Sequence, residues 1–167
     1  GQGYTVCYGL EEYKEKASGK EKVVFCQASS KEESAANYVS DAKTEEDITL
    51  AKMVEMGIES LGSEEPFFIM CEGGTIDWAA HDNRTMSMVN DVIAFDQAIK
   101  VAYEFYLKHK DETLIIVTAD HETGGLTLKK GEYKYTSGGH TAVNIPVLVY
   151  GSDKIVSGGE KLNNYEI

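Results

Sequence analysis

The chain of 167 residues is long enough for one domain with a hydrophobic core, and its hydrophobic content of 42% agrees with that prediction. Its formal net charge of −12 argues against binding to nucleic acid or to anionic membranes, because both need a basic surface. No apolar run approaches the ~20 residues that span a bilayer. A soluble single domain over residues 1–167 is therefore predicted.

The start of the chain and its cysteines set two further limits. The chain begins Gly1-Gln2-Gly3, with neither Met nor the regions of a signal peptide, so any export signal is expected to lie outside it. The three cysteines show no CxxC spacing, which argues against a disulfide framework and against a thiolate zinc site. We expect buried free thiols.

Short apolar runs without alternation predict the strands, at residues 23–26, 67–71, 114–117 and 147–150. Such runs are typical of strands that are buried on both faces, as in the interior of a parallel sheet. Between the first two runs, residues 29–47 are polar and rich in small side chains, which predicts a solvated loop with room for a short helix.

Two helices are predicted from periodicity. In the first, Thr44 and Asp47 offer a capping box, and Gly62 ends a run of apolar residues spaced by three or four, which are Leu50, Val54, Ile58 and Leu61. The second helix is expected from Thr85 to His109. Its apolar face would carry Met88, Val92, Phe95, Ile99 and Phe105, and its polar side Asp91, Lys100, Glu104 and Lys108.

This alternation of strands and helices predicts an α/β fold, layered α/β/α with a mostly parallel sheet. In such folds ligands bind at the carboxyl ends of the strands. Glu72, Asp77 and His81 follow the run at 67–71, and Asp77 and His81, four residues apart, can bind one metal ion from the same helix face. Taken alone, they are better explained as loop acids and a solvated histidine.

Two more segments carry metal-binding side chains next to predicted strands. Asp120 and His121 follow the run at 114–117, and both can reach one metal where the strand ends and the chain turns at Gly124-Gly125. His140 stands in a glycine-rich segment before the last strand, which alone is a weak signal. The fourth histidine, His109, is explained by the dipole at a helix C-terminus.

The segments EGGTIDWAAH (72–81), TADHETGG (118–125) and GGHTAVNIPVLVYG (138–151) resemble, in order and spacing, the C-terminal portion of the alkaline phosphatase family. The resemblance is best over residues 67–151, the motif-rich core. It implies a fragment of the alkaline phosphatase-like fold and a phosphate monoester hydrolase that uses Zn²⁺ and Mg²⁺. These cations would offset the chain's negative charge, which otherwise repels an anionic substrate.

The resemblance also implies the roles of single residues. Asp77, His81 and His140 would bind one zinc, Asp120 and His121 a second zinc, and Glu72 a magnesium. In the family a serine attacks phosphorus and forms a phosphoserine intermediate, which a zinc-bound hydroxide hydrolyses. Trp78, next to Asp77, would either shape the surroundings of the phosphate or pack against the helix start.

Other parts of that active site are absent from this sequence: the serine nucleophile, the carboxylate that bridges zinc and magnesium, and the phosphate-binding arginine. The only arginine, Arg84, stands at a predicted helix start. No catalytic residue is therefore assigned, and we expect the chain alone to bind about one zinc and to show no turnover. Its exposed apolar edges would favour self-association.

The family resemblance further implies an extracytoplasmic protein, periplasmic or secreted, and often a homodimer. Two alternatives stay open. One is another metallohydrolase of the same superfamily, such as a phosphodiesterase, a sulfatase or a phosphoglycerate mutase. The other is a non-catalytic metal-binding domain that retains the ligands for structural reasons.

Overall fold

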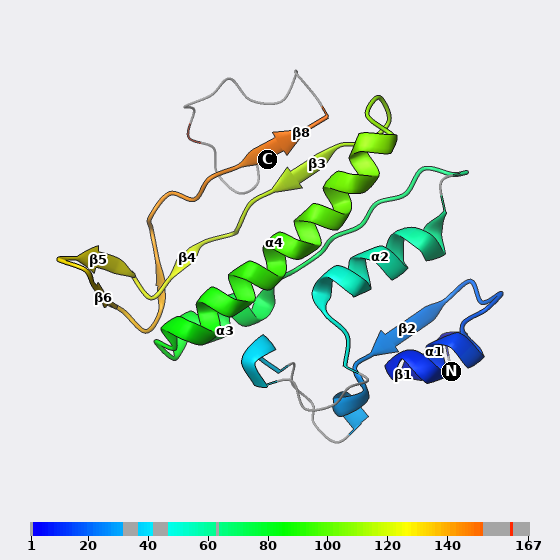
Figure 1. Ribbon diagram of the computed structural model, residues 1–167, viewed down its shortest axis with the longest axis horizontal. Helices are drawn as coiled ribbons and strands as arrows, with labels where there is room; N and C mark the ends of the chain where they lie inside the picture. Colours follow the sequence, from blue (N-terminus) through cyan, green and yellow to red (C-terminus); the bar gives the residue numbers. More distant parts are fainter. Residues whose placement is uncertain (1, 32–36, 42–46, 63, 152–160, 162–167) are drawn as a thin grey trace.

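The computed structural model describes residues 2–31, 37–41, 47–62, 64–151 and 161 (Figure 1). In its first part the elements are β1 (Thr5–Tyr8), α1 (Gly9–Lys16), β2 (Val23–Cys26), the short 3-10 helices η1 (Ala28–Lys31) and η2 (Val39–Asp41), and α2 (Leu50–Leu61). They are followed by α3 (Gly74–His81), α4 (Thr85–Lys108), β3 (Ile115–Val117), β4 (Glu122–Thr123), β5 (Thr127–Lys129), β6 (Glu132–Lys134), β7 (His140–Thr141) and β8 (Leu148–Tyr150).

The long helix α4 is the central element. Figure 1 shows α2 along one side of it and the pair β3–β8 along the other, with β1, β2 and α1 beyond α2. The buried apolar side chains of the described residues are those of Cys7, Val54, Met56, Ala79, Ala80 and Ala98, so the core lies mainly between α2, α3 and α4. None of the described helices is long and apolar enough to cross a bilayer.

The strands pair two by two. Among the described residues β1 and β2 run parallel, whereas β3–β8, β4–β7 and β5–β6 are antiparallel. Helices and strands are mixed, as an α/β fold requires, but they alternate only from β1 to β2, since α2, α3 and α4 follow one another and precede β3 to β8; parallel pairing is likewise confined to β1–β2. The predicted burial on both faces is also wrong for the pair β3–β8, in which Ile116 and Leu148 are 42% and 51% exposed.

Residues 67–71 form an extended segment between α2 and α3 (Figure 1) that is not part of a described sheet, so the predicted strand is wrong here. The physical reason is that a strand exists only with a hydrogen-bonded partner, and none of the described strands pairs with this segment. Phe68 and Met70 are 85% and 72% exposed as a result. Phe67 packs against Phe105 of α4, with ring centroids 5.8 Å apart.

The predicted helix α2 is confirmed, but its N-cap is Thr49. The Thr49 hydroxyl accepts a hydrogen bond from the backbone N–H of Lys52, as an N-cap does. The predicted capping box falls partly on Thr44, which lies outside the described residues. At the other end Gly62 has a φ of 70°, a conformation that favours glycine and ends the helix.

Helix α4 is also confirmed, and Met88, Phe95, Ile99 and Phe105 of its predicted apolar face are half-buried, but its most buried residues are others. Its buried residues are Ser87, Asp91 and Ala98, whereas Val92 is 44% exposed. Asp91, predicted on the polar side, is only 3% exposed because its carboxylate accepts a hydrogen bond of 2.8 Å from the backbone N–H of Val39. It thereby holds η2 against α4.

Candidate metal centre

Helix α3 presents two of the predicted ligands on one face. Asp77 and His81 are one turn apart, and His81 Nε2 lies 3.4 Å from Asp77 Oδ2. Ala79 on the opposite face and Ala80 at its side are buried. Small apolar side chains on that face let α3 lie close to its neighbours, so the acidic and imidazole groups point toward solvent and toward β7.

The other two histidines come from the short pair β4–β7. His121 directly precedes β4 and His140 begins β7, and their rings stack with centroids 3.5 Å apart and an interplanar angle of 19°. His140 Nε2 is 3.1 Å from His81 Nε2 and 3.8 Å from Asp77 Oδ1. Three segments that are far apart in the sequence therefore converge on Asp77.

The hydrogen bonds of two histidines determine which ring nitrogen is free. His81 Nδ1 lies 2.7 Å from the carbonyl oxygen of Gly138, which can only accept, so Nδ1 carries a proton, and in a neutral ring Nε2 keeps its lone pair. The Thr123 hydroxyl donates its single proton to Asp77 Oδ1 over 2.6 Å and so accepts from His121 Nδ1 at 3.2 Å. In a neutral His121 ring, Nε2 is therefore the nitrogen without a proton.

This arrangement is suited to a cation. Donor atoms of Asp77, His121 and His140 lie within 4.8 Å of one another, and His81 borders the same group. Two imidazole nitrogens 3.1 Å apart repel each other unless a proton or a metal ion lies between them. Carboxylate oxygen and imidazole nitrogen are ligands that zinc accepts, and the four side chains are only partly buried, which leaves room for further ligands.

The remaining two predicted ligands lie differently. Asp120 stands beside His121, with Oδ2 3.3 Å from Nε2, and its side chain is 79% exposed. Glu72 precedes α3 and lines a cavity of about 440 Å³ together with Tyr38, Trp78 and Asp91. The structure therefore brings five of the six residues to one place and puts Glu72 at the wall of this cavity.

The corner between α3 and α4 is held by Arg84 and by two residues, Tyr38 and Asp82, that the sequence did not single out. Tyr38 donates a hydrogen bond of 3.2 Å to Asp82, and the Arg84 guanidinium lies 4.4 Å from the centroid of the Tyr38 ring. Burial raises the pKa of Tyr38, and the negative charge of Asp82 raises it further. These contacts fix the turn that follows His81.

Thr123 and Glu122 are two more residues that the sequence did not reveal. Thr123 links Asp77 to His121, whereas the Glu122 carboxylate accepts hydrogen bonds from the backbone of Gly125 and Leu126 and from the Thr141 hydroxyl. The sequence offered one indication of their role, which is that both directly follow the predicted ligand His121 in the segment 118–125.

Comparison with known proteins agrees with these observations. A model of the alkaline phosphatase family matches residues 31–144. The chain belongs to the alkaline phosphatase family. Alkaline phosphatase 4 of Bacillus subtilis (strain 168) is 47% identical over 89 residues, which are 53% of this chain and 18% of that protein. The alkaline phosphatase of Escherichia coli (strain K12) is 39% identical over 74 residues, which are 44% of this chain and 16% of that protein.

Solved alkaline phosphatases also share the fold. The enzyme of the Antarctic bacterium TAB5 superposes with a TM-score of 0.74 at 32% identity, over 90% of this chain and 46% of that one. A variant of the same enzyme, 30% identical to this chain, has Mg bound in a site called M3. The fold class is thus confirmed as a fragment of the α/β fold of alkaline phosphatases. The chain spans about half of that structure and less than a fifth of the two curated relatives.

Membership of this family implies divalent metals, and the group around Asp77 is a site that fits one.

Proposed function

We propose that this chain is the metal-binding part of a zinc-dependent phosphate monoester hydrolase, an alkaline phosphatase, whose phosphoserine intermediate forms on a residue outside residues 1–167. The observation that carries the proposal is the convergence of Asp77, His121 and His140, whose donor atoms lie within 4.8 Å of one another although they come from three segments. Family membership supplies the reaction type.

Asp77, His81 and His140 would hold one zinc ion, and Asp120 and His121 would be ligands of a second. Glu72 would bind a magnesium ion. When bound, such ions polarise phosphoryl oxygens and lower the pKa of bound water or of a hydroxyl group. The residues present fit this role, since the free Nε2 atoms of His81 and His121 face Asp77 and Asp120.

The surrounding residues prepare the ligands for this task. Thr123 orients the Asp77 carboxylate, and the carbonyl of Gly138 fixes the His81 ring with its lone pair toward the site. Partners of this kind raise the basicity of the ligands and hold their orientation. With its ligands only partly buried, the site remains accessible to a small phosphate ester.

Several properties of the whole protein belong to the same proposal. The substrates would be small-molecule phosphate monoesters, the parent protein would be extracytoplasmic and either periplasmic or secreted, and it would assemble as a homodimer. Residues 1–167 would form a single domain. Without a serine nucleophile in the required context, this chain would be inactive on its own.

Calorimetric titration with zinc tests the metal site, and an aryl phosphate assay tests the lack of turnover. We expect about one tightly bound zinc per chain, loss of tight binding in His81→Ala, and no hydrolysis. His109→Ala is the matched control, because His109 stacks on Phe105 at the end of α4 and should leave zinc binding unchanged. Failure of the wild-type chain to bind zinc would contradict the metal proposal.

Hydrolysis by the wild-type chain that His81→Ala abolishes would contradict the proposed inactivity. Hydrolysis that persists in His81→Ala would point to a contaminating enzyme. If the parent protein lacks a serine in the required upstream context, the alternative of a non-catalytic metal-binding domain would replace the hydrolase.

A further inference from the structure

The pair β4–β7 supports two of the metal ligands although each strand has only two residues. Glu122 lies opposite Thr141, and Thr123 opposite His140. Such a short pair has few ladder hydrogen bonds, and an isolated two-stranded ribbon is marginal in water. Contacts outside the ladder must therefore help to hold His121 and His140 together.

The Glu122 side chain supplies such contacts. Its Oε2 atom accepts a short hydrogen bond from the Thr141 hydroxyl and a bond of 3.2 Å from the backbone N–H of Gly125. Its Oε1 atom accepts from the backbone N–H of Leu126 over 3.3 Å. A single half-buried carboxylate thus joins β4, β7 and the turn between β4 and β5.

Side-chain alternation separates this group from the metal ligands. Successive residues of a strand point to opposite faces, so Glu122 and Thr141 share one face of the pair, whereas Thr123 and His140 share the other. The second face points to the metal centre, because Thr123 Oγ1 is 2.6 Å and His140 Nε2 is 3.8 Å from Asp77 Oδ1. A slip of one residue would turn His140 away from Asp77.

The turn that Glu122 holds also contacts helix α3. Gly124 has a φ of 90°, and a Cβ there would lie 2.8 Å from the Tyr135 ring and 3.2 Å from the carbonyl oxygen of Ala80. At Gly125 a Cβ would lie 2.1 Å from Thr136 Oγ1. The turn is thus packed closely between residues 135–136, which follow β6, and the helix that carries Asp77 and His81.

We infer that Glu122 is a positioning residue of the metal centre: through Thr141 and the turn at Gly125 it fixes the register of β4 on β7 and so the separation of His121 and His140. The inference rests on the proposed metal site for its functional meaning. Glu122 binds no metal itself, because its carboxylate is engaged by the turn and by Thr141 on the face opposite to the ligands.

Cobalt(II) titration of the full chain tests this, because the visible absorption of cobalt reports the ligand geometry. We expect Glu122→Gln and Thr141→Val to weaken cobalt binding by about 10-fold to 100-fold and to change the spectrum. Losses of this size are typical when residues that orient the metal ligands are replaced. The double variant should bind no more weakly than the weaker single one, because both act on the same group of hydrogen bonds around the Glu122 side chain. Thr141→Ser keeps the hydroxyl and should retain wild-type affinity.

Glu132→Gln is the matched control for the charge, since Glu132 lies in β6 and pairs only weakly with Lys134 at 3.8 Å. A second measurement is independent of metal: the nuclear Overhauser contact between the α protons of Thr123 and His140, which are register partners. It should be present in the wild type and in Glu132→Gln, and lost in Glu122→Gln. If Glu122→Gln does not fold, Thr141→Val makes the same test with a smaller change.

The outcomes separate the two proposals. If the wild type binds no cobalt but Glu122→Gln loses the Thr123–His140 contact, the metal function fails and the role of Glu122 in the register stands. The inference about Glu122 is overturned if Glu122→Gln and Thr141→Val match the control Glu132→Gln in three measurements: cobalt affinity, cobalt spectrum and the Thr123–His140 contact. A loss in Thr141→Ser equal to that in Thr141→Val would also overturn it.

Discussion

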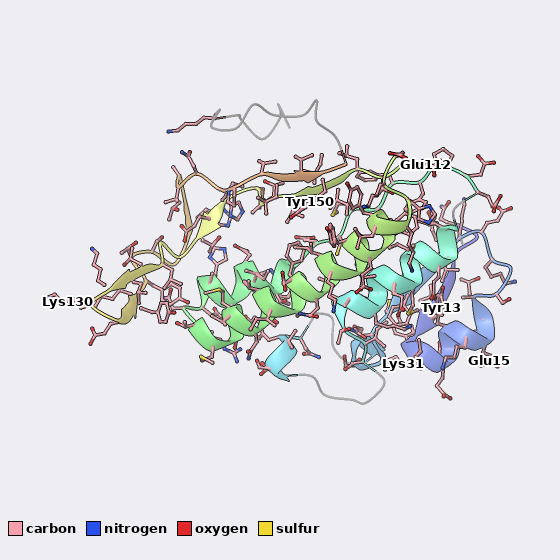
Figure 2. The ribbon with its side chains drawn as sticks, turned by 45° about the horizontal axis from the view of Figure 1, so that its top comes forward. Tyr13, Glu15, Lys31, Glu112, Lys130 and Tyr150 are labelled. Atoms are coloured by element: carbon pink, nitrogen blue, oxygen red, sulfur yellow. The ribbon has the colours of Figure 1, made fainter. Side chains whose placement is uncertain are left out.

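The two ends of this molecule are held together by different forces. Figure 2 shows Tyr13, Glu15 and Lys31 at one end, near β1, α1 and β2, and Lys130 at the other, at the tip of the β5–β6 hairpin next to the metal centre. At the first end Cys7 is completely buried and Tyr13 packs edge-on against Phe25, with centroids 5.8 Å apart. Side chains of β1, α1 and β2 thus pack against one another at this end.

The metal centre has less apolar support. Its two short strands are joined by polar contacts of Glu122 and Thr123, and His121 and His140 stack on each other at 3.5 Å. Leu128 and Tyr133 of the neighbouring hairpin are 62% and 59% exposed. The comparison teaches that apolar packing holds the first end, whereas polar contacts of Glu122 and Thr123 join the strands at the second.

Zinc should produce the largest difference between the two ends. A ligand that binds only the folded state stabilises it by about 4 kcal/mol at a free concentration of 1,000 times its dissociation constant. We expect zinc to slow amide hydrogen exchange at residues 121–124 and 139–141, with little change at residues 5–8 and 23–26. A chelator should reverse the effect, and His81→Ala should remove it. Equal slowing at both ends would show that they open as one unit.

The next largest effect is expected at the joint between the two ends, where Asp91 holds η2 to α4. Asp91→Ala removes the acceptor for the buried N–H of Val39 and should lower the free energy of unfolding by about 1–3 kcal/mol, measured in urea. Asp91→Asn keeps one acceptor oxygen and should cost less. The matched control is Asp96→Ala on the exposed side of the same helix, for which a change within about 0.5 kcal/mol is expected.

A smaller effect on stability is expected at the extended segment 67–71. Phe68 is 85% exposed, so Phe68→Lys should change the free energy of unfolding by no more than about 0.5 kcal/mol. It should nevertheless reduce self-association, because a charge on an open extended segment opposes pairing with another chain. Light scattering over a range of protein concentrations measures this. Phe68→Leu is the apolar control, and equal association of both variants would contradict the role of this segment.

Local patterns predicted the parts of the fold that depend on neighbouring residues. The spacing of Leu50, Val54 and Ile58 predicted α2, and a similar periodicity predicted α4, because a helix forms its hydrogen bonds within its own segment. The strand predicted at 67–71 failed because strand formation depends on a partner that can lie anywhere in the chain. Asp91 was misplaced for the same reason, since its partner Val39 is 52 residues away.

The candidate site was predictable in its chemistry and less so in its geometry. Asp77, His81 and His140 drew attention by residue type and by their place next to predicted strands, and the structure brings them together. The assignment of each residue to a particular ion stays a prediction. The parts played by Thr123 and Glu122 depend on the register of β4 on β7, which no pattern within the segment 118–125 determines.

The smallest expected effect concerns the acid sensitivity of the end that contains β1, α1 and β2. Glu12 accepts hydrogen bonds from Lys31 Nζ at 2.6 Å and from the backbone N–H of Tyr8 at 3.2 Å, and forms an ion pair with Lys16 at 3.0 Å. The Lys31 contact, followed by those of Tyr8 and Lys16, lowers the pKa of Glu12 from 4.5 to about 2. This unit therefore contains a carboxylate that is favoured in its charged form.

A carboxyl group whose pKa is lower in the folded state stabilises that state above its unfolded pKa and loses the contribution as pH falls through the folded one. The contribution of Glu12 should thus be complete above about pH 4.5 and decline toward pH 2. The amide shift of Tyr8, which donates to Glu12, should titrate in that range at low salt, and Glu12→Gln should abolish the titration. Glu11→Gln, on the exposed side of α1, is the control. A Tyr8 titration near pH 4.5 would show that the ion pairs of Glu12 are too well solvated to stabilise this end. Apolar packing of its buried side chains would then account for its difference from the metal centre.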